Sequence, residues 1–182
     1  MGKTREMNLD ARKLNIRNWF GIGGTRITST AAQLNKLAAT TGYPVEAHEV
    51  SFTETSGAGV WTGSVAVPAG ATIHDILVNG VALWDSETSA TMKVGDTGND
   101  AGYYTGVNLK ATDLLAGESL SFALAGGKAG AYIANSQVSP RYSASARTIT
   151  GTITKVGTTG TAGRTRMTVV FSLPTATDAT KA

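Results

Sequence analysis

From residue 46 onward, hydrophobic and polar residues alternate over short stretches, and glycine-rich turns interrupt the alternation. The stretch VWTGSVAVP at residues 60–68 is an example, because Trp61, Val65 and Val67 fall on one face of an extended chain. The other stretches are also rich in β-branched and aromatic residues, which favour strands. The pattern predicts about ten short strands, which span residues 49–55, 60–68, 71–78, 81–85, 90–96, 103–109, 119–125, 131–135, 148–156 and 164–174.

Two of these stretches meet at Asn79-Gly80, within ATIHDILVNGVALWD. Asn-Gly is favoured in type I′ turns, because both central residues of that turn have positive φ. Apolar residues flank the pair on both sides. We therefore predict a two-residue hairpin that joins strands at 71–78 and 81–85.

No stretch after residue 46 repeats its hydrophobic residues with a helical period over the length of a helix. A parallel sheet needs such helices as crossover connections, so it is excluded. Evenly spaced short strands with glycine-rich turns are typical of an antiparallel β-sandwich or jelly roll. We expect a mainly β body over residues 46–182, preceded at residues 1–45 by an extended N-terminal arm and one short helix.

The stretch ITSTAAQLNKLAATTGYP at residues 27–44 has a helical pattern instead. Thr30 and Gln33 fit a capping box, and Gly42 supplies a C-terminal stop. A helix of about a dozen residues is marginal in water by itself, so this one has to dock on another surface. Its narrow stripe of small and apolar residues consists of Ala31, Leu34, Leu37 and Ala38.

The arm extends to about residue 26 and contains Trp19 and Phe20 beside three glycines, in the stretch LNIRNWFGIGG. These two large apolar residues have no periodic context. Two interpretations remain open, since the pair can dock on a neighbouring protein or fold back onto the core of this chain. No apolar stretch reaches the 18 or so residues of a membrane helix, and the N-terminus has no secretory h-region. We expect neither a membrane span nor signal-directed export.

Charged residues make up only 16% of the chain, compared with about 25% in soluble domains. A surface that is low in charge and rich in Thr, Ser, Gly and Ala is expected where much of it faces other subunits, although secreted β-domains share this composition. The chain contains no cysteine. Disulfides, thiolate metal sites and cysteine nucleophiles are therefore excluded.

Charge is unevenly distributed along the chain. Residues 1–36 hold seven Lys/Arg and two acids (+5), residues 46–118 hold two Lys and ten acids (−8), and residues 128–182 hold seven Lys/Arg and one acid (+6), which sum to +3. Basic ends can contact nucleic acid, or opposite charges can attract within one chain or between copies. The bases are dispersed singly, without interleaved aromatic residues to stack on bases. We therefore predict no nucleic-acid partner.

Residues with catalytic or metal-binding chemistry are few. His48 and His74 lie in strand-like contexts without a second histidine at a metal-ligand spacing, which predicts solvated strand histidines. Asp96, Asn99 and Asp100 gather in the loop GDTGNDAGYYTG, which fits either a calcium site or an ordinary turn. The loop does not match an EF-hand, since its twelfth position is Val107. We expect no enzyme, no cofactor and no metal, and the calcium question stays open for residues 96–100.

Two stretches resemble proteins of tailed bacteriophages. ITSTAAQLNKLA resembles the T-A-A-E-L-N-x-L segment found at arm-to-body junctions of phage head and fibre proteins. VPAGATIHDILVNGVALWDSETSATMKVGDTGNDAGYYTGVNL resembles the β-domain of small head-decoration, or cement, proteins, with its PAGA turn, A-T-x-K-V-G-D strand and Gly-Asp loop. Together they cover 55 of the 182 residues, and residues 126–182 carry no such resemblance.

The resemblance implies a virion structural protein on the capsid exterior, commonly a homotrimer, whose partner is the major capsid protein. In that role the helix stripe Ala31, Leu34, Leu37 and Ala38 is an interface between copies. The resemblance also implies an acidic capsid surface, which basic side chains of the arm contact while two aromatic side chains act as apolar anchors. The capsid-binding residues expected on this basis are Arg5, Arg12, Lys13, Arg17, Trp19 and Phe20.

Two other function classes remain as alternatives. A head-fibre, tail or receptor-binding module of the virion requires an exposed aromatic platform, to which Trp84, Tyr103 and Tyr104 are the candidate contributors. The same three residues fit a position in or beside the core. A β-sandwich enzyme or a free carbohydrate-binding protein is the third class.

Overall fold

The computed structural model describes residues 21–22, 25–26, 45–110, 112–134, 141–158 and 160–173. The chain divides into two units, Met1–Thr41 and Gly42–Ala182. In the first unit, β1 (Gly21–Ile22) pairs antiparallel with β2 (Thr25–Arg26). The helix predicted over residues 27–44 lies outside the described residues, and so do its predicted interface residues.

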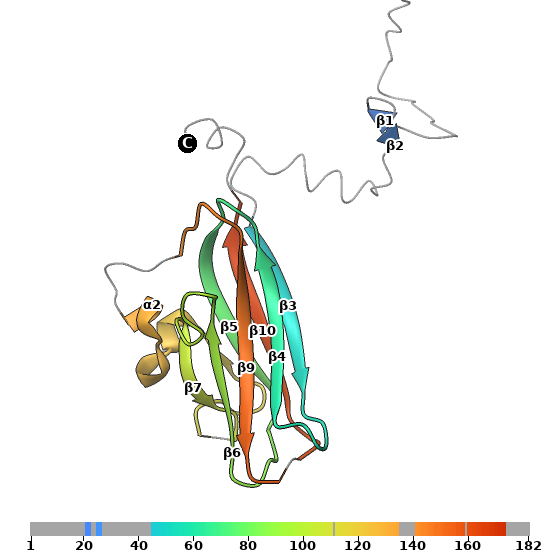
Figure 1. Cartoon of the computed structure of the whole chain (residues 1–182), viewed down its shortest axis with the longest axis vertical. Coiled ribbons are helices and arrows are strands. Elements are labelled where there is room, and N and C mark those ends of the chain that lie inside the picture. The colour runs from blue at the N-terminus through green and yellow to red at the C-terminus, as the bar shows by residue number, and fades with distance from the viewer. Residues whose placement is uncertain are drawn as a thin grey trace, which may run out of the picture. The chain divides into compact units, whose positions relative to one another are not determined.

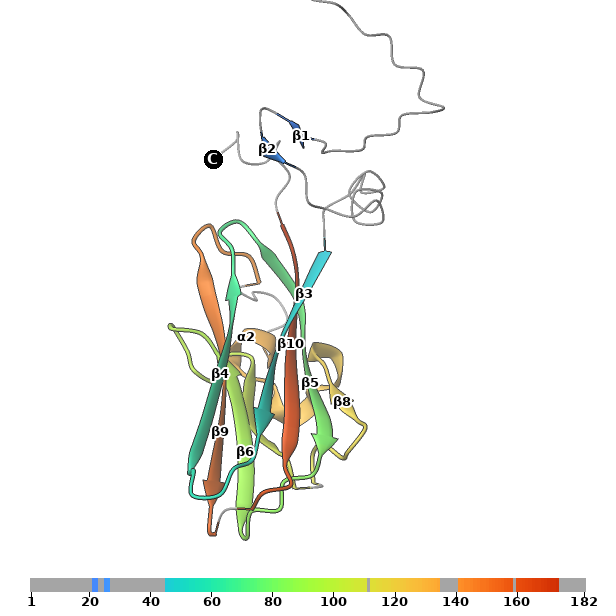
Figure 2. The same cartoon turned by 90° about the vertical axis from the view of Figure 1, so that its right-hand side faces the viewer.

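The second unit is a sandwich of two four-stranded antiparallel sheets (Figure 1). The first sheet has the order β3 (Val45–Thr53), β10 (Arg164–Ser172), β5 (Thr72–Ala82) and β8 (Ser119–Leu120). The second has the order β4 (Val60–Val67), β9 (Arg147–Val156), β6 (Ser89–Gly95) and β7 (Tyr104–Asn108). Figure 2 shows the two sheets as separate layers. The predicted mainly β, antiparallel fold class is confirmed.

Strands that are consecutive in sequence mostly belong to different sheets. Among the described strands of the second unit, only β6 and β7 are neighbours both along the chain and within a sheet, whereas β3 pairs with β10, and β4 with β9. Strand pairing in this unit therefore depends on contacts between distant parts of the chain, which local turn signals do not specify.

The core lies between the sheets and is built from alternate residues of each strand. On β4, Val65 and Val67 are buried and Trp61 is half-buried, so the predicted common face of these three residues is confirmed. Gly63 and Gly151 are paired in the second sheet, and the ring of Phe52 from the first sheet occupies the space above them. Large buried side chains from both sheets complete the core, including Ile73, Ile76, Met92, Ile149, Ile153, Met167 and Phe171.

The hairpin predicted at Asn79-Gly80 is wrong. Strand β5 continues through this pair, with Asn79 opposite Arg166 and Gly80 opposite Thr165 on β10. Gly80 is required by a close approach instead of a turn, because a Cβ atom there would lie 2.4 Å from the carbonyl oxygen of Leu115. The Gly80 N–H donates to the carbonyl of Glu118 at 3.0 Å. The glycine therefore lets a later loop pair with β5.

Two predicted strands, at residues 119–125 and 131–135, are largely absent from the sheets. Only β8 forms in the first, and it is followed by the short 3-10 helices η1 (Phe122–Leu124) and η2 (Gly126–Lys128) and by the one-turn helix α2 (Ala131–Ala134). The apolar residues of these stretches are anchors, not strand faces. Phe122 stacks on Tyr103 with ring centroids 5.8 Å apart, and Tyr132 contacts the same ring edge-on at 5.2 Å.

Candidate functional site

The predicted site residues of the arm and helix lie outside the described part of the chain. This applies to the capsid-binding residues Arg5, Arg12, Lys13, Arg17, Trp19 and Phe20, and to the interface residues Ala31, Leu34, Leu37 and Ala38. Both groups remain predictions. The surfaces that the structure describes belong to the β-sandwich.

The sandwich has two distinct ends. At one end, Val45 at the start of β3 lies opposite Ser172 at the end of β10, so the segments that precede and follow the sandwich join it at the same place. We call this the terminal end. At the opposite end, which is the lower end in Figure 1, the loops β3–β4, β5–β6 and β9–β10 come together. We call this the loop end.

A buried carboxylate holds the loop end together. Glu54, in the β3–β4 loop, has only 2% of its surface exposed. Its Oε2 accepts hydrogen bonds from the backbone N–H of Asp85 (3.1 Å) and of Gly163 (3.0 Å). Its Oε1 accepts from the backbone N–H of Gly160 (3.2 Å) and from the hydroxyl of Ser86. One side chain thus ties three loops to one another, and its donors satisfy the charge that burial would otherwise penalise.

Nothing in the local sequence identifies Glu54. Its four hydrogen-bond partners lie 31, 32, 106 and 109 positions away along the chain. The surrounding stretch FTETSGAG looks like an ordinary polar loop. Only the folded arrangement brings the donors to the carboxylate.

Two exposed carboxylates add a second set of contacts at the loop end. Asp85 accepts hydrogen bonds from the backbone N–H groups of Ala162 (3.1 Å) and Thr161 (2.9 Å). Glu87 accepts from the N–H (3.0 Å) and hydroxyl (2.9 Å) of Thr158. The N–H of Ala162 is the largest cause that lowers the pKa of Asp85, and the N–H of Thr158 has the same effect on the pKa of Glu87.

These lowered pKa values predict that the sandwich loses stability in acid. A carboxylate whose pKa is lower when folded contributes its full stabilisation above the unfolded pKa of about 4, and loses it as pH falls through the folded pKa. We expect the melting temperature, followed by circular dichroism, to fall between pH 5 and pH 3. The double variant Asp85→Asn/Glu87→Gln should show a smaller fall over that range. An equal fall in both proteins would assign the acid sensitivity to other groups.

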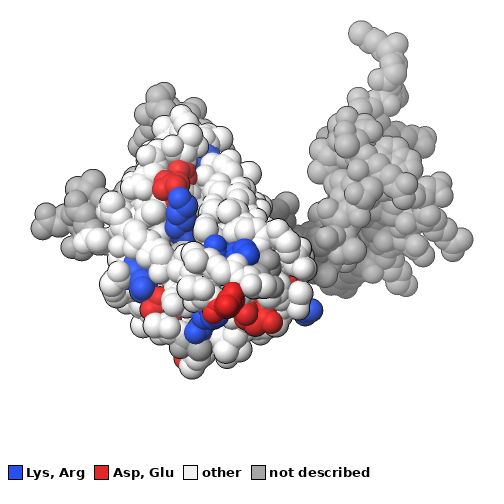
Figure 3. All heavy atoms as spheres, turned by 60° about the horizontal axis from the view of Figure 1, so that its bottom comes forward, with Lys and Arg blue, Asp and Glu red and all other residues white. Residues whose placement is uncertain are grey.

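Figure 3 looks toward the loop end and shows acidic and basic side chains interspersed, not gathered by sign. A surface of this kind does not present the basic stripe that tracks a phosphate backbone. On this face, the distribution agrees with the interpretation that charges of opposite sign attract one another within the chain or between copies.

The three aromatic residues considered for a receptor platform are buried. Trp84 is 2% exposed, and Tyr103 and Tyr104 are 0% exposed. The indole of Trp84 donates to the Thr165 hydroxyl at 2.9 Å, and the hydroxyl of Tyr104 donates to the Ile76 carbonyl at 2.6 Å. Burial raises the pKa of Tyr103 to about 12 and also raises that of Tyr104. The core interpretation of these three residues is confirmed.

The Gly-Asp loop has the hydrogen bonds of a turn. Asp96 Oδ1 accepts from the N–H groups of Gly98 (2.9 Å) and Asn99 (3.1 Å), and from the Tyr132 hydroxyl (3.1 Å). Asp100 forms an ion pair with Lys93 on β6. Within the described ranges, no group of three His, Cys, Asp or Glu side chains is placed to hold a metal ion. The turn interpretation accounts for these residues.

The two histidines lie where the sequence predicts. His48 on β3 and His74 on β5 are both exposed. His48 Nε2 lies 3.0 Å from Glu46 Oε2 on the same strand. Both are strand histidines at the surface.

One shallow hollow lies at the terminal end, beside the end of β4 and the start of β9. It has a volume of about 250 Å³ and is lined by Ala66, Val67, Pro68, Ala146, Arg147 and Thr148. Arg147 is its one titratable residue, so the lining contains no pair of groups for acid–base chemistry.

The described helices include none that is long and apolar enough to cross a membrane.

Comparisons with known proteins reveal a shared fold. No protein-family model matches the chain, and no curated protein matches it. A chain in the acidic stable capsid structure of Helicobacter pylori bacteriophage KHP30 is similar, with a TM-score of 0.50 and 14% identity over 74% of this chain and 92% of that chain. Matches also occur in the cyanophage Pam1 capsid asymmetric unit (TM-score 0.48, 16% identity, 85% and 98% covered) and in the capsid of Ralstonia phage GP4 (0.47, 14%, 76% and 90%).

Proposed function

We propose that this chain is a phage virion structural protein that binds the outside of the capsid and stabilises it, as a decoration or cement protein. The first support is the fold likeness to a chain of the bacteriophage KHP30 capsid structure. We also infer a jelly roll. Counted from β3 to β10 as strands one to eight, the sheets have the orders 1-8-3-6 and 2-7-4-5, so the chain crosses between sheets as in double Greek-key sandwiches.

The observation that carries the proposal is that the two ends of the sandwich differ. The segments that precede and follow it join at the terminal end, where Val45 lies opposite Ser172. The other end is closed by the buried, fully hydrogen-bonded carboxylate of Glu54. A body attached through one end and stiffened at the other suits a knob that stands on a protein surface, with the N-terminal arm as its attachment.

The arm is proposed to contact the major capsid protein. Residues 1–36 carry a net charge of +5, from seven Lys/Arg and two acids, which suits an acidic partner. Charged contacts of this kind speed and orient association, whereas buried aromatic side chains contribute most of the affinity. The proposed contact residues are the charged Arg5, Arg12, Lys13 and Arg17 and the apolar anchors Trp19 and Phe20.

The proposed assembly is a homotrimer with a non-enzymatic role. Three copies of the helix predicted over 27–44 would meet through Ala31, Leu34, Leu37 and Ala38. The alanines permit close approach, and the leucines of each copy would contact those of a neighbour. Each trimer then brings three arms to the shell, and the high effective concentration of the second and third arms makes attachment persistent. The location of the protein is then the capsid exterior, and no cofactor is needed.

A head-fibre, tail or receptor-binding module of the virion is the alternative. The loop end is the surface available for such a role, because it lies opposite the terminal end. The burial of Trp84, Tyr103 and Tyr104 removes the aromatic platform proposed for that role. The cement role is therefore the stronger proposal.

Particle melting tests the proposal. Phage particles that carry the protein should release DNA at a higher temperature than particles without it, because a bridge between neighbouring capsomers adds interface area and raises the barrier to shell rupture. The measurement is fluorescence of a DNA dye on heating, with particles reloaded with purified protein as the control. Equal release temperatures with and without bound protein would refute the cement role and favour the receptor-binding module.

A further inference from the structure

The sandwich has four sheet edges, and the chain covers the one at β7. The N–H of Gly130 donates to the carbonyl of Tyr103 at 2.7 Å, and the N–H of Tyr132 donates to the carbonyl of Gly102 at 2.7 Å. Tyr104 on β7 forms an isolated bridge with Ala129. The segment after β8 therefore pairs with the first residue of β7 and with the two residues before it.

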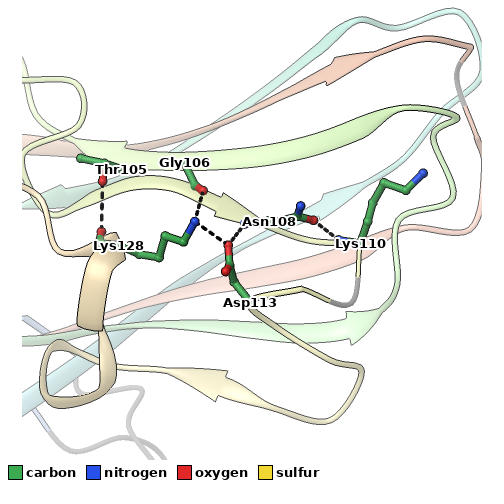
Figure 4. A network of polar contacts seen from close by, with 6 residues as sticks. All are labelled: Thr105, Gly106, Asn108, Lys110, Asp113 and Lys128. Atoms are coloured by element: carbon green, nitrogen blue, oxygen red, sulfur yellow. Dashed lines mark hydrogen bonds and ion pairs between the residues drawn. The ribbon is translucent and has the colours of Figure 1, made fainter.

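Figure 4 shows the side chains that hold this cover in place. The ammonium of Lys128 lies 2.9 Å from the carboxylate of Asp113 and donates to the carbonyl of Gly106 on β7 at 3.4 Å. Asp113 also accepts from the N–H of Asn108 at 2.6 Å. The covering segment thus contacts β7 directly at the Gly106 carbonyl and indirectly through Asp113, which lies in the loop after β7.

The outer edge of β5 is covered as well. β8 pairs with Val78 and Asn79, and the loop before it pairs with Gly80. Near the start of β5, the N–H of Ile73 donates to the carbonyl of Arg141 at 2.9 Å. The chain thus contacts this edge at both ends of β5.

The other two edges, β3 and β4, have no strand or loop of the described residues paired to their outer sides. They differ in charge. β3 carries Glu46, His48 and Glu49, and charged side chains on an edge strand discourage further pairing. β4 contains no charged residue and no proline over eight residues, and its register with β9 is free of bulges. β4 therefore lacks the usual protections of an edge strand.

We propose that the outer edge of β4 pairs antiparallel with β4 of a second copy of this chain across a two-fold axis, which joins the second sheets of two copies into one. A strand that could pair with the outer edge of β4 must have a free edge of its own, β-branched residues and no charged residue. Among the described strands, β4 itself meets this description. A two-fold contact uses the same surface twice, so one strand supplies both sides.

The side chains of β4 are compatible with self-pairing. Residues opposite one another across an antiparallel pair share a face of the sheet, so an axis near Ser64 sets Thr62 against Ala66 of the second copy. These outward side chains are small or hydroxylic. Ser64 already forms such a contact within the chain, with its hydroxyl 3.0 Å from that of Thr150 on β9. Hydroxyl pairs across strands add to the backbone hydrogen bonds.

The contact is expected to be weak in dilute solution. Pairing along a single strand buries much less than the roughly 1,600 Å² of a standard stable interface. The contact becomes effective where copies are held side by side, because a high effective concentration then compensates for its low affinity. The proposal goes beyond the proposed function and does not depend on the arm or on the capsid.

The test compares three forms of the full-length chain by sedimentation velocity over a concentration series: wild type, Ser64→Lys and Ala47→Lys. Both substituted residues are exposed and lie on open edge strands, so both variants should keep the wild-type circular dichroism spectrum and melting temperature. All three forms keep the helix of the proposed homotrimer, so the readout is association beyond the oligomer that the helix contact forms. This further association should depend on concentration in the same way in wild type and Ala47→Lys. In Ser64→Lys, two lysines face each other near the axis, and association should need at least about tenfold higher concentration.

Hydrogen exchange then distinguishes strand pairing from other contacts. Exchange of amides at residues 60–67 should slow as the wild-type concentration rises, whereas amides at 45–53 should exchange at an unchanged rate. Absence in wild type of any association beyond the oligomer that the helix contact forms would overturn the proposal. Unchanged association of a folded Ser64→Lys variant, or association without slower exchange at 60–67, would overturn it equally.

Discussion

A chain that lacks residues 1–26 is expected to lose measurable binding to capsids while its β-sandwich stays folded. The sandwich should persist because, in the part of the chain that the structure describes, the buried core residues all lie between Phe52 and Phe171. Binding should be lost because the proposed charged and apolar contacts all lie within the deleted stretch. Co-sedimentation with capsids measures binding, and circular dichroism with thermal melting measures folding. A chain that lacks residues 174–182 is the matched control and should bind as the full-length chain does.

Point variants separate the two kinds of arm contact. Trp19→Ala/Phe20→Ala removes two large side chains, each worth about 2 kcal/mol when buried, so each arm should bind about a thousandfold more weakly. This loss should be insensitive to salt, because apolar burial is not screened. A variant with Arg5, Arg12, Lys13 and Arg17 replaced by Gln should bind more weakly at low salt and approach wild type at high salt, where exposed charges are screened.

The outcome of the truncation decides where attachment lies. Full occupancy of capsids by the chain that lacks residues 1–26 would move the attachment surface to the β-sandwich. Loss of binding together with loss of the β-sheet spectrum would instead show that the arm is needed for folding. The melting curve therefore has to accompany every binding measurement.

Glu54→Ala is expected to destabilise the sandwich more than any substitution of an exposed carboxylate. The substitution leaves three backbone N–H groups and the Ser86 hydroxyl without their acceptor. Each buried donor left unsatisfied costs about 1–3 kcal/mol, and water reaches some of these groups. We expect the free energy of unfolding to fall by about 4 kcal/mol and the melting temperature by about 10 °C.

Two further variants give this prediction its controls. Glu54→Gln keeps one carbonyl acceptor, and the Ser86 hydroxyl can turn to accept from the amide, so it should destabilise less than Glu54→Ala. Glu49→Ala removes an exposed carboxylate 3.6 Å from Arg166, and such surface pairs are worth about 1 kcal/mol or less. Equal melting temperatures for Glu54→Ala and Glu49→Ala would show that the cluster around Glu54 does not hold the loop end together.

The sequence predicted the fold class well because alternation survives in the long strands. On β4 and β10, alternate residues face the core, and most residue types agree with their face. The prediction from sequence failed where the same residue type occurs in two different structural roles. Asn79-Gly80 is the usual signal of a tight hairpin, but here the glycine makes room for the Leu115 carbonyl. The apolar residues Phe122 and Tyr132 looked like strand faces, but they are anchors on the ring of Tyr103.

The candidate surfaces also differ in whether the local sequence carries a signal for them. The arm and helix residues were proposed from sequence and remain predictions, since charge, aromatic content and capping signals are local properties. The importance of Glu54 and the difference between the open and covered sheet edges had no local signal. The partners of Glu54 come from two other loops, and the cover of β7 comes from a segment more than 20 residues later.

By itself, the sequence determined which residues face the core in regular strands such as β4 and β10, because side chains of an extended chain alternate between two faces whatever strand lies beside them. It also determined the charge of each edge strand, including the uncharged β4. Only the tertiary structure decided which strands became edges, which edges were covered and which carboxylate was buried. These features depend on pairing between segments far apart in the chain, as in β3 with β10 and β4 with β9, and no short-range pattern encodes that pairing.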